Sequence, residues 1–151
     1  MKIIKNYING KHLESQSSNF SEIFNPSTGE VIGKVNLSNK NDLDIALDSC
    51  NKAMLGWQNT SPLKRSRIMF EFKNILNSNI EELAKIVSLE HGKTIEDAKG
   101  SITRGLEVVE FACGIPHLLK GEFSQNVGTE IDSWSVRQPL GICAGITPFN
   151  F

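Results

Sequence analysis

Residues 147–150, which read Thr-Pro-Phe-Asn, carry side chains that could do chemistry. The apolar run 140–146 before them is typical of a parallel strand buried on both faces. Because ligands bind at the carboxyl ends of such strands, Thr147 and Phe149 could offer main-chain carbonyls and an apolar wall to a ligand. Asn150 adds a neutral amide donor that can stabilise a developing oxyanion, although an Asn at this place is also a common helix cap.

Arg104 is the second candidate for chemistry. On a helical wheel, one apolar face carries Ile95, Ile102, Leu106, Val109 and Cys113, and Arg104 lies on the opposite side, at the head of a second stripe formed by Val108, Phe111 and Ile115. A guanidinium beside buried apolar groups needs an anionic partner, because its desolvation is expensive. That partner could be an internal carboxylate or the carboxylate of a ligand held bidentately, and spacing alone leaves both open.

The three cysteines and three histidines show no further reactive pattern. Cys50, Cys113 and Cys143 are too far apart for a disulfide framework or a metal site, and the histidines lack paired-ligand spacing. Cys50 falls in the apolar stripe of a helix and Cys143 in the expected buried strand, so both are interpreted as unreactive core residues. No metal site is predicted.

The elements that must position Arg104 and residues 147–150 begin with two β-hairpins over residues 6–36. Asn9-Gly10 is a strong hairpin turn, and the segment 25–29, Asn-Pro-Ser-Thr-Gly, is a second turn before a strand that starts at Val31.

Four amphipathic helices are predicted next. The first carries an apolar stripe from Leu43 to Trp57, and the second begins at Ser61 and Pro62. The buried face of the second helix is predicted to consist of Ile68, Phe72, Ile75 and Leu76. The third runs between a cap at Asn79 and a stop at Gly92, and the fourth starts at Thr94 and is kinked or ended by Pro116.

After Gly121 the pattern is again typical of strands. Polar and apolar residues alternate through Ile131, Trp134 and Val136, which indicates a half-exposed antiparallel ribbon before the buried strand. A buried parallel strand needs neighbours on both sides, and the chain contains no other candidate for that sheet. We therefore expect an α/β fold that is incomplete within these residues.

Composition limits the classes of function. The chain has 151 residues, of which 39% are hydrophobic and 22% charged, and a net charge of −1, which favours one globular domain and argues against a nucleic-acid or membrane partner. Because no signal peptide or membrane span is recognisable, we expect a cytoplasmic protein.

The sequence resembles the N-terminal part of the aldehyde dehydrogenase family. The resemblance covers residues 7–151 through YINGK, FNPSTGEVIGKV, EHGKTIEDAKG and QPLGICAGITPFNF, in that order. Within the family, residues 92–121 and the Pro-Phe-Asn-Phe ending resemble the methylmalonate-semialdehyde dehydrogenase branch, which is coenzyme A-acylating. The implied division is hairpins and helices of the cofactor domain over 1–128, an oligomerisation ribbon over 129–138, and the first strand of the Rossmann-like cofactor fold with the start of the site over 139–151.

The resemblance also assigns roles to single residues. Asn150 matches the amide that holds the oxyanion, Thr147 and Phe149 match positions that line the NAD site, and Arg104 matches the arginine that recognises the semialdehyde carboxylate. The family usually has Ala where this chain has Thr147, so a main-chain contact is expected there. This match makes a ligand carboxylate the favoured partner of Arg104.

The implied reaction oxidises a semialdehyde on a cysteine thiolate with NAD and passes the acyl group to coenzyme A, with loss of the carboxylate, to give propionyl-CoA or acetyl-CoA. None of the three cysteines matches the family's nucleophile, so the chain alone is expected to be inactive. Two alternatives stay open: a non-catalytic chain that pairs with full-length subunits, and a non-acylating aldehyde dehydrogenase. A homo-oligomer, dimer or tetramer, is expected for the full-length protein.

Overall fold

The computed structural model describes residues 2–148, and its first element is a three-stranded sheet. Strand β5 (Val31–Asn36) is central, with β1 (Lys2–Ile4) parallel on one side and β4 (Phe20–Phe24) antiparallel on the other. The β4–β5 hairpin confirms the predicted turn, in which the Asn25 side chain accepts a hydrogen bond from the Ser27 amide. Strand β1 was not predicted, because three residues are too short to show a period.

A separate hairpin pairs β2 (Asn6–Ile8) with β3 (Lys11–Leu13) and confirms the first predicted turn. Asn9 and Gly10 have φ values of 51° and 72°, the left-handed pair that a two-residue hairpin turn of type I′ requires. Tyr7 and His12 face each other across the strands with their ring centroids 5.1 Å apart. The turn chemistry therefore fixes this register locally.

Helix α1 (Lys40–Gln58) confirms the first predicted helix but not its burial. Asn39 and Asp42 form a capping box at its start. Leu43, Trp57 and Cys50 are all exposed, so the interpretation of Cys50 as a core residue is wrong in this structure. The physical reason is that, among the described residues, α1 has no helix packed along its apolar stripe.

Helices α2 (Pro62–Ser78), α3 (Ile80–His91) and α4 (Ile95–Cys113) form a bundle in which α4 contacts both others. The predicted caps Ser61 and Thr94 and the left-handed stop at Gly92 are confirmed. Asn79 precedes α3 as predicted, but its side chain donates to the Ile75 carbonyl instead of capping α3. The short helix α5 (Ile115–Leu118), which contains Pro116, follows where α4 ends.

The core of the bundle is small and lies on the predicted face of α4. Its buried apolar side chains are Ala84 of α3 and Ala98, Leu106 and Cys113 of α4. The predicted buried face of α2 is wrong for the described residues, since Ile68, Phe72 and Ile75 are exposed and Leu76 is only partly buried. Helix α4 packs instead against the side of α2 that carries Ser66.

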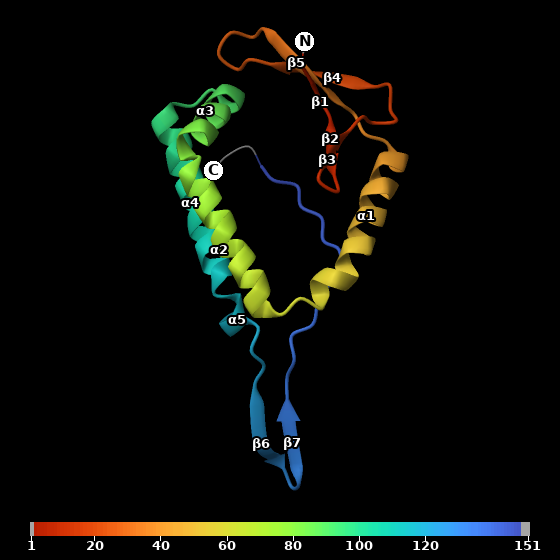
Figure 1. The fold of residues 1–151 in the computed structure, drawn as a ribbon, viewed down its shortest axis with the longest axis vertical. Coiled ribbons are helices and arrows are strands. Elements are labelled where there is room, and N and C mark those ends of the chain that lie inside the picture. The colour runs from red at the N-terminus through yellow and green to blue at the C-terminus, as the bar shows by residue number, and fades with distance from the viewer. Residues whose placement is uncertain (1, 149–151) are drawn as a thin grey trace.

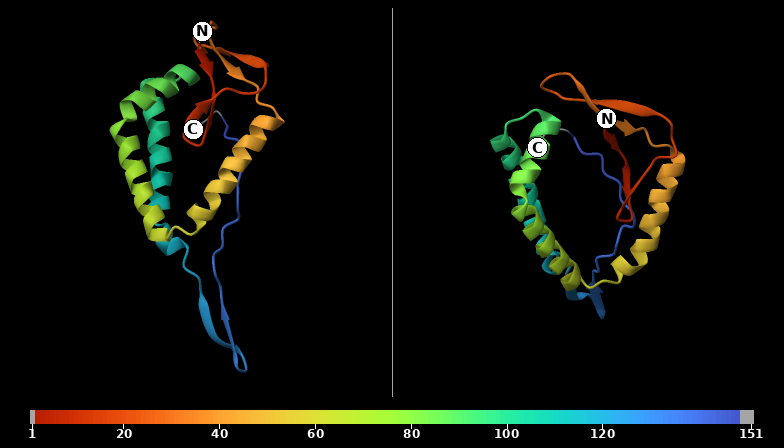
Figure 2. Two further views of the ribbon diagram at one scale, coloured as in Figure 1. Left: turned by 45° about the vertical axis from the view of Figure 1, so that its right-hand side comes forward. Right: turned by 45° about the horizontal axis from the view of Figure 1, so that its top comes forward.

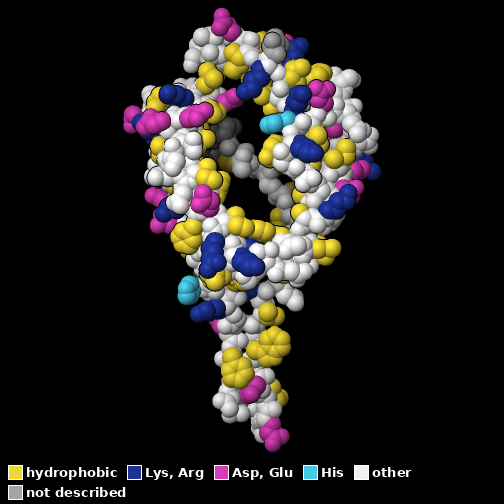
Figure 3. Space-filling model, in the orientation of Figure 1, with side chains coloured by type: hydrophobic (Ala, Val, Ile, Leu, Met, Phe, Trp, Pro, Cys, Tyr) yellow, Lys and Arg dark blue, Asp and Glu magenta, His cyan; other side chains and the backbone are white. Residues whose placement is uncertain are grey.

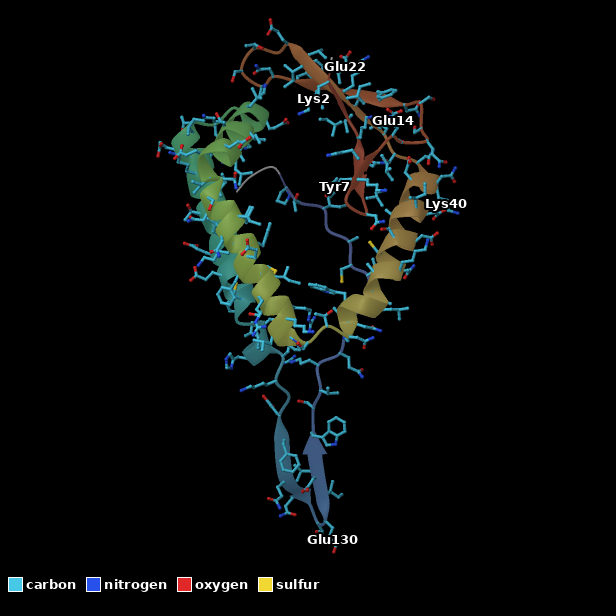
Figure 4. All side chains as sticks on the ribbon, in the orientation of Figure 1. Lys2, Tyr7, Glu14, Glu22, Lys40 and Glu130 are labelled. Carbon is cyan, nitrogen blue, oxygen red and sulfur yellow. The ribbon has the colours of Figure 1, made fainter. Side chains whose placement is uncertain are left out.

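Strands β6 (Phe123–Gly128) and β7 (Ile131–Trp134) form an antiparallel hairpin that projects away from the rest of the molecule (Figure 1). Glu130 lies at its tip (Figure 4). Phe123 and Trp134 are directly paired and exposed, and the hairpin begins six residues before the predicted ribbon. At its base, a Cβ on Gly121 would lie 1.9 Å from the Ser135 carbonyl oxygen, so only glycine fits there.

Residues 135–148 lead back from the hairpin as an extended segment without strand pairing. The buried strand predicted for 140–146 is not formed: Leu140 is 95% exposed and Ile146 is 100% exposed. Cys143 is likewise exposed, so its interpretation as a buried thiol is wrong here. The reason is the one that the sequence indicated, because no described strand lies beside this segment to pair with it.

The elements together form a ring with a tail. The sheet, α1 and the α2–α4 bundle surround a central opening, and the β6–β7 hairpin extends from the base (Figures 1 and 2). The space-filling view shows this opening with hydrophobic side chains along its edge (Figure 3). The ring closes where the β4–β5 turn meets the α3–α4 corner, since a Cβ on Gly92 would lie 3.1 Å from Pro26 Cγ.

Candidate functional site

Arg104 lies in the middle of α4, on the side away from the bundle core. The helix is continuous, so Arg104, Val108 and Phe111 lie on one side, as the wheel predicts. Val108 and Phe111 are each 69% exposed, and Arg104 is exposed with them. The expectation that this stripe is buried is therefore wrong for the described residues. The structure places Arg104 on an exposed side of α4.

Thr147 lies in the exposed extended segment near the end of the described chain. Phe149 and Asn150 lie outside the described residues. Arg104 and Thr147 thus come from separate elements, a helix and an extended segment. The structure does not bring the four sequence-predicted residues together into one described site.

Contacts at both ends of α4 hold the helix that carries Arg104. At its C-terminal end, the Ser66 hydroxyl of α2 donates to the Cys113 carbonyl at 2.6 Å, and the Lys73 ammonium lies 2.9 Å from the Glu110 carboxylate. Near its N-terminal end, the Lys99 ammonium lies 2.8 Å from Glu81 of α3. Because these contacts bridge three helices, the position of Arg104 is set by the bundle.

Lys99 is the cation with a perturbed titration in this bundle. Its hydrogen bond to Glu81, assisted by the charges of Glu81 and Glu96, raises the pKa of Lys99 above its ordinary value. Burial acts in the opposite direction and is outweighed. Lys99 therefore stays charged across the neutral range and serves as a link between α3 and α4.

Sequence reasoning missed a buried polar junction around Asp42. Its carboxylate accepts hydrogen bonds from the Ser15 hydroxyl at 2.6 Å and from the backbone amides of Gln16 and Asn39, each at 2.9 Å. These bonds lower the pKa of Asp42, with the Ser15 bond as the largest cause. The Asn-x-x-Asp capping box at 39–42 was the signal that could have revealed it. The junction fixes the chain after β3 to the start of α1.

Neither a metal site nor a membrane-spanning helix is found in the part of the chain that the structure describes. Residues 2–148 contain no group of three or more His, Cys, Asp or Glu side chains that could hold a metal ion. Over the same residues, every helix is too short or too polar to span a bilayer. The recognisable chemistry is that of Arg104 and of the segment that leads to residues 147–150.

The mixed arrangement of hairpins, helices and an exposed ribbon is that of the N-terminal portion of an aldehyde dehydrogenase fold. The sequence pattern described as the Aldehyde dehydrogenase family matches residues 12–151. The chain belongs to this family.

Within the family, the chain is similar to dehydrogenases of malonate and methylmalonate semialdehyde. The chain is 47% identical over 151 residues to a malonate-semialdehyde dehydrogenase of Pseudomonas aeruginosa, covering 100% of the chain and 30% of that protein. It is 43% identical over 148 residues to a mouse protein named methylmalonate-semialdehyde/malonate-semialdehyde dehydrogenase [acylating], mitochondrial, covering 98% of the chain and 28% of that protein.

Solved structures give the same result. A Sinorhizobium meliloti 1021 protein assigned as a methylmalonate-semialdehyde dehydrogenase, complexed with NAD, matches with a TM-score of 0.95 at 52% identity, over 100% of this chain and 31% of that one. The methylmalonate-semialdehyde dehydrogenase of Oceanimonas doudoroffii matches with a TM-score of 0.93 at 45% identity, over 99% and 30%. The chain thus spans about 30% of the length of these relatives.

Proposed function

We propose that the chain is the N-terminal segment of an NAD-dependent, coenzyme A-acylating dehydrogenase of malonate or methylmalonate semialdehyde. The observation that carries this proposal is 47% identity across all 151 residues to a malonate-semialdehyde dehydrogenase. The 52% identity to a semialdehyde dehydrogenase complexed with NAD supports the cofactor. Oxidation with decarboxylation, to acetyl-CoA or propionyl-CoA, is the proposed outcome.

In this proposal Arg104 recognises the substrate carboxylate. Arg104 is exposed and α4 is held by contacts to two neighbouring helices, so the charge is presented from a fixed element. A guanidinium fork matches a carboxylate bidentately, which distinguishes a semialdehyde acid from an uncharged aldehyde. Burial of Val108 and Phe111 by further protein would strengthen this interaction, because a lower local dielectric constant strengthens attraction between charges.

Of the residues proposed to contact NAD, Thr147 lies within the described part of the chain. Thr147 is exposed in a segment without strand pairing, which suits a main-chain contact to NAD. NAD would supply the hydride acceptor. Phe149 is proposed to line the same site and Asn150 to donate its amide N–H to the oxyanion. Both assignments rest on the family resemblance.

The exposed hairpin favours self-association. Phe123 and Trp134 form an exposed aromatic pair, and Val127, Ile131 and Val136 nearby are also exposed. Exposed apolar strands of this kind are typical interaction surfaces. We propose a homo-oligomer that pairs through residues 123–138. A chain that pairs with full-length subunits without catalysing the reaction is the second candidate, favoured by the same hairpin.

The test of the carboxylate role replaces Arg104 with Gln in a polypeptide that joins this segment to the family's catalytic residues. Loss of a charged hydrogen-bonding partner is expected to raise KM for malonate semialdehyde by about tenfold or more. The KM for an uncharged aldehyde of similar size should not change. Arg67→Gln, an exposed change on α2, is the matched control. An unchanged KM for malonate semialdehyde would contradict the proposal.

A second assay separates the catalytic proposal from the non-catalytic one. The 151-residue chain is incubated with malonate semialdehyde, NAD and coenzyme A, and NADH formation is followed. We expect no turnover above background, because none of its cysteines matches the family nucleophile. Turnover by the chain alone would contradict this expectation. Co-purification of the separate chain with full-length subunits would favour the partner function.

A further inference from the structure

A groove of about 490 Å³ lies at the base of the ring, away from Arg104 and Thr147. It is lined by residues 58–62, which form the end of α1, the α1–α2 linker and the start of α2, by Arg65 of α2, by Leu119, and by the segment 137–139 after the hairpin. Arg65 and Arg137 both line it, and none of the lining residues is acidic. Lys and Arg side chains gather in this region, just above the hairpin (Figure 3).

Arg65 has a hydrogen-bonding group that the described protein leaves unused. Its Nε is shielded from solvent and has no hydrogen-bond partner among the described residues. A buried N–H without an acceptor is costly, and the cost is greater for a charged group. Native proteins rarely leave such a group unsatisfied unless a ligand, an ion or further protein supplies the acceptor.

The polar side chains of residues 59–61, which also line the groove, make hydrogen bonds within the protein. The Asn59 amide donates to the Leu55 carbonyl and the Thr60 hydroxyl donates to the Gly56 carbonyl. Ser61 caps α2, with its hydroxyl oxygen accepting from the Lys64 amide at 3.4 Å. The groove therefore offers two guanidinium groups beside the positive end of a 17-residue helix.

We propose that this groove binds an oxyanion, a phosphate or carboxylate group, between Arg65 and Arg137. A guanidinium presents parallel N–H donors that match both kinds of oxyanion. Two positive charges without a lining carboxylate favour a doubly charged phosphate over a singly charged carboxylate. Because Arg137 is exposed, the affinity should fall as salt is added. This site is independent of the proposed dehydrogenase activity.

The test measures the thermal stability of the full chain in inorganic phosphate, in acetate and in chloride at matched ionic strength. Binding to the native state raises Tm, and the rise grows with the logarithm of the ligand concentration once that concentration exceeds Kd. Phosphate also stabilises proteins non-specifically, so the decisive quantity is the difference between the natural chain and Arg137→Gln. We expect the phosphate concentration needed for a given specific rise in Tm to be about tenfold higher in this variant.

Arg67→Gln is the matched control, because Arg67 is on the same helix, is exposed and does not line the groove. It should respond to phosphate as the natural chain does. Arg65→Lys, which keeps the charge but removes the Nε donor, should also weaken binding. A response to phosphate or to acetate that Arg137→Gln removes supports the site and identifies the oxyanion. Equal responses in the natural chain and Arg137→Gln, or equal losses in Arg137→Gln and Arg67→Gln, would overturn the proposal.

Discussion

Replacing Gly121 with Ala tests the base of the β6–β7 hairpin directly. The added Cβ would lie 1.9 Å from the Ser135 carbonyl oxygen and 2.9 Å from its carbon, whereas contacts under 3.0 Å are essentially never seen for a real Cβ. The two backbone segments must therefore separate by about 1 Å or more at this point. Because both contacts are to backbone, no side-chain rotation can relieve the clash.

This separation breaks the two hydrogen bonds that close the hairpin. The Ser135 amide donates to the Glu122 carbonyl and the Glu122 amide donates to the Ser135 hydroxyl, each at 2.9 Å. At about 1 kcal/mol each, the hairpin base loses about 2 kcal/mol of local stability. Where amide exchange is governed by the equilibrium between closed and open hairpin, this corresponds to about thirtyfold faster exchange, since 1.4 kcal/mol is a factor of ten.

Hydrogen exchange followed by mass spectrometry over residues 119–137 is the assay. Gly56→Ala provides the matched control, because Gly56 lies in α1 and a Cβ there meets nothing within 4 Å. The control should leave the hairpin unchanged and stabilise α1 by up to about 1 kcal/mol. Unchanged exchange of the Glu122 and Ser135 amides in Gly121→Ala would refute the reasoning. If the hairpin mediates self-association, sedimentation should also show a weaker oligomer.

Three further changes have defined outcomes. Asp42→Asn should lower the free energy of unfolding at neutral pH and remove the part of the acid dependence of that free energy that comes from Asp42. Because the pKa of Asp42 is lowered in the folded chain, its stabilisation is present above the unfolded pKa, about 3.9, and is lost as pH falls through the folded pKa. Urea melts at several pH values check this, and a difference from the natural chain that does not shrink below about pH 4 would contradict it. Gly92→Ala should destabilise by about 1 kcal/mol or more in the same melts, because φ is +82° and the new Cβ meets Pro26; an equal or higher denaturation midpoint would disagree. Ser66→Ala should cost about 1–3 kcal/mol by leaving the buried Cys113 carbonyl without its donor, and a cost no larger than that of Ser78→Ala, an exposed position on α2, would count against that bond.

The local features of the fold were predictable from the sequence. The turn at Asn9-Gly10, the cap at Ser61 and the stop at Gly92 are each specified by side chains within a few residues, so they can be recognised without knowledge of the tertiary contacts. The capping role assigned to Asn79 was wrong because the Ile75 carbonyl competes for its amide. Strand β1 was missed because three residues are too short to show a period and because its pairing partner lies about 30 residues away.

Burial was less predictable than secondary structure. A helix wheel shows which residues share a side, but not which side a neighbouring element covers. The wheel gave the core face of α4 because α2 and α3 pack there, and it failed for α1 and for Phe72 of α2 because no described element covers those stripes. For the same reason Leu140 is exposed despite lying in a run that is typical of a buried strand.

The candidate site was predictable only in part. The residue type and position of Arg104 pointed to an anion, and the structure places it on an accessible surface of a fixed helix. The groove at Arg65 could not be predicted, because its members come from four separate stretches of chain. Asn150 stays a prediction from the family resemblance.

The approach of Pro26 to Gly92 has a consequence for chain entropy. It joins two points 66 residues apart in sequence, but most of the residues between them are already ordered in β5 and in helices α1 to α3. Closing the ring therefore restricts mainly the short linkers and costs much less entropy than closing a flexible loop of that length. The linker between α1 and α2 at residues 59–61 is the pivot about which the sheet and α1 would move if this contact were lost. Spin labels on α1 and α4 should report a broader distribution of distances in Gly92→Ala than in the natural chain.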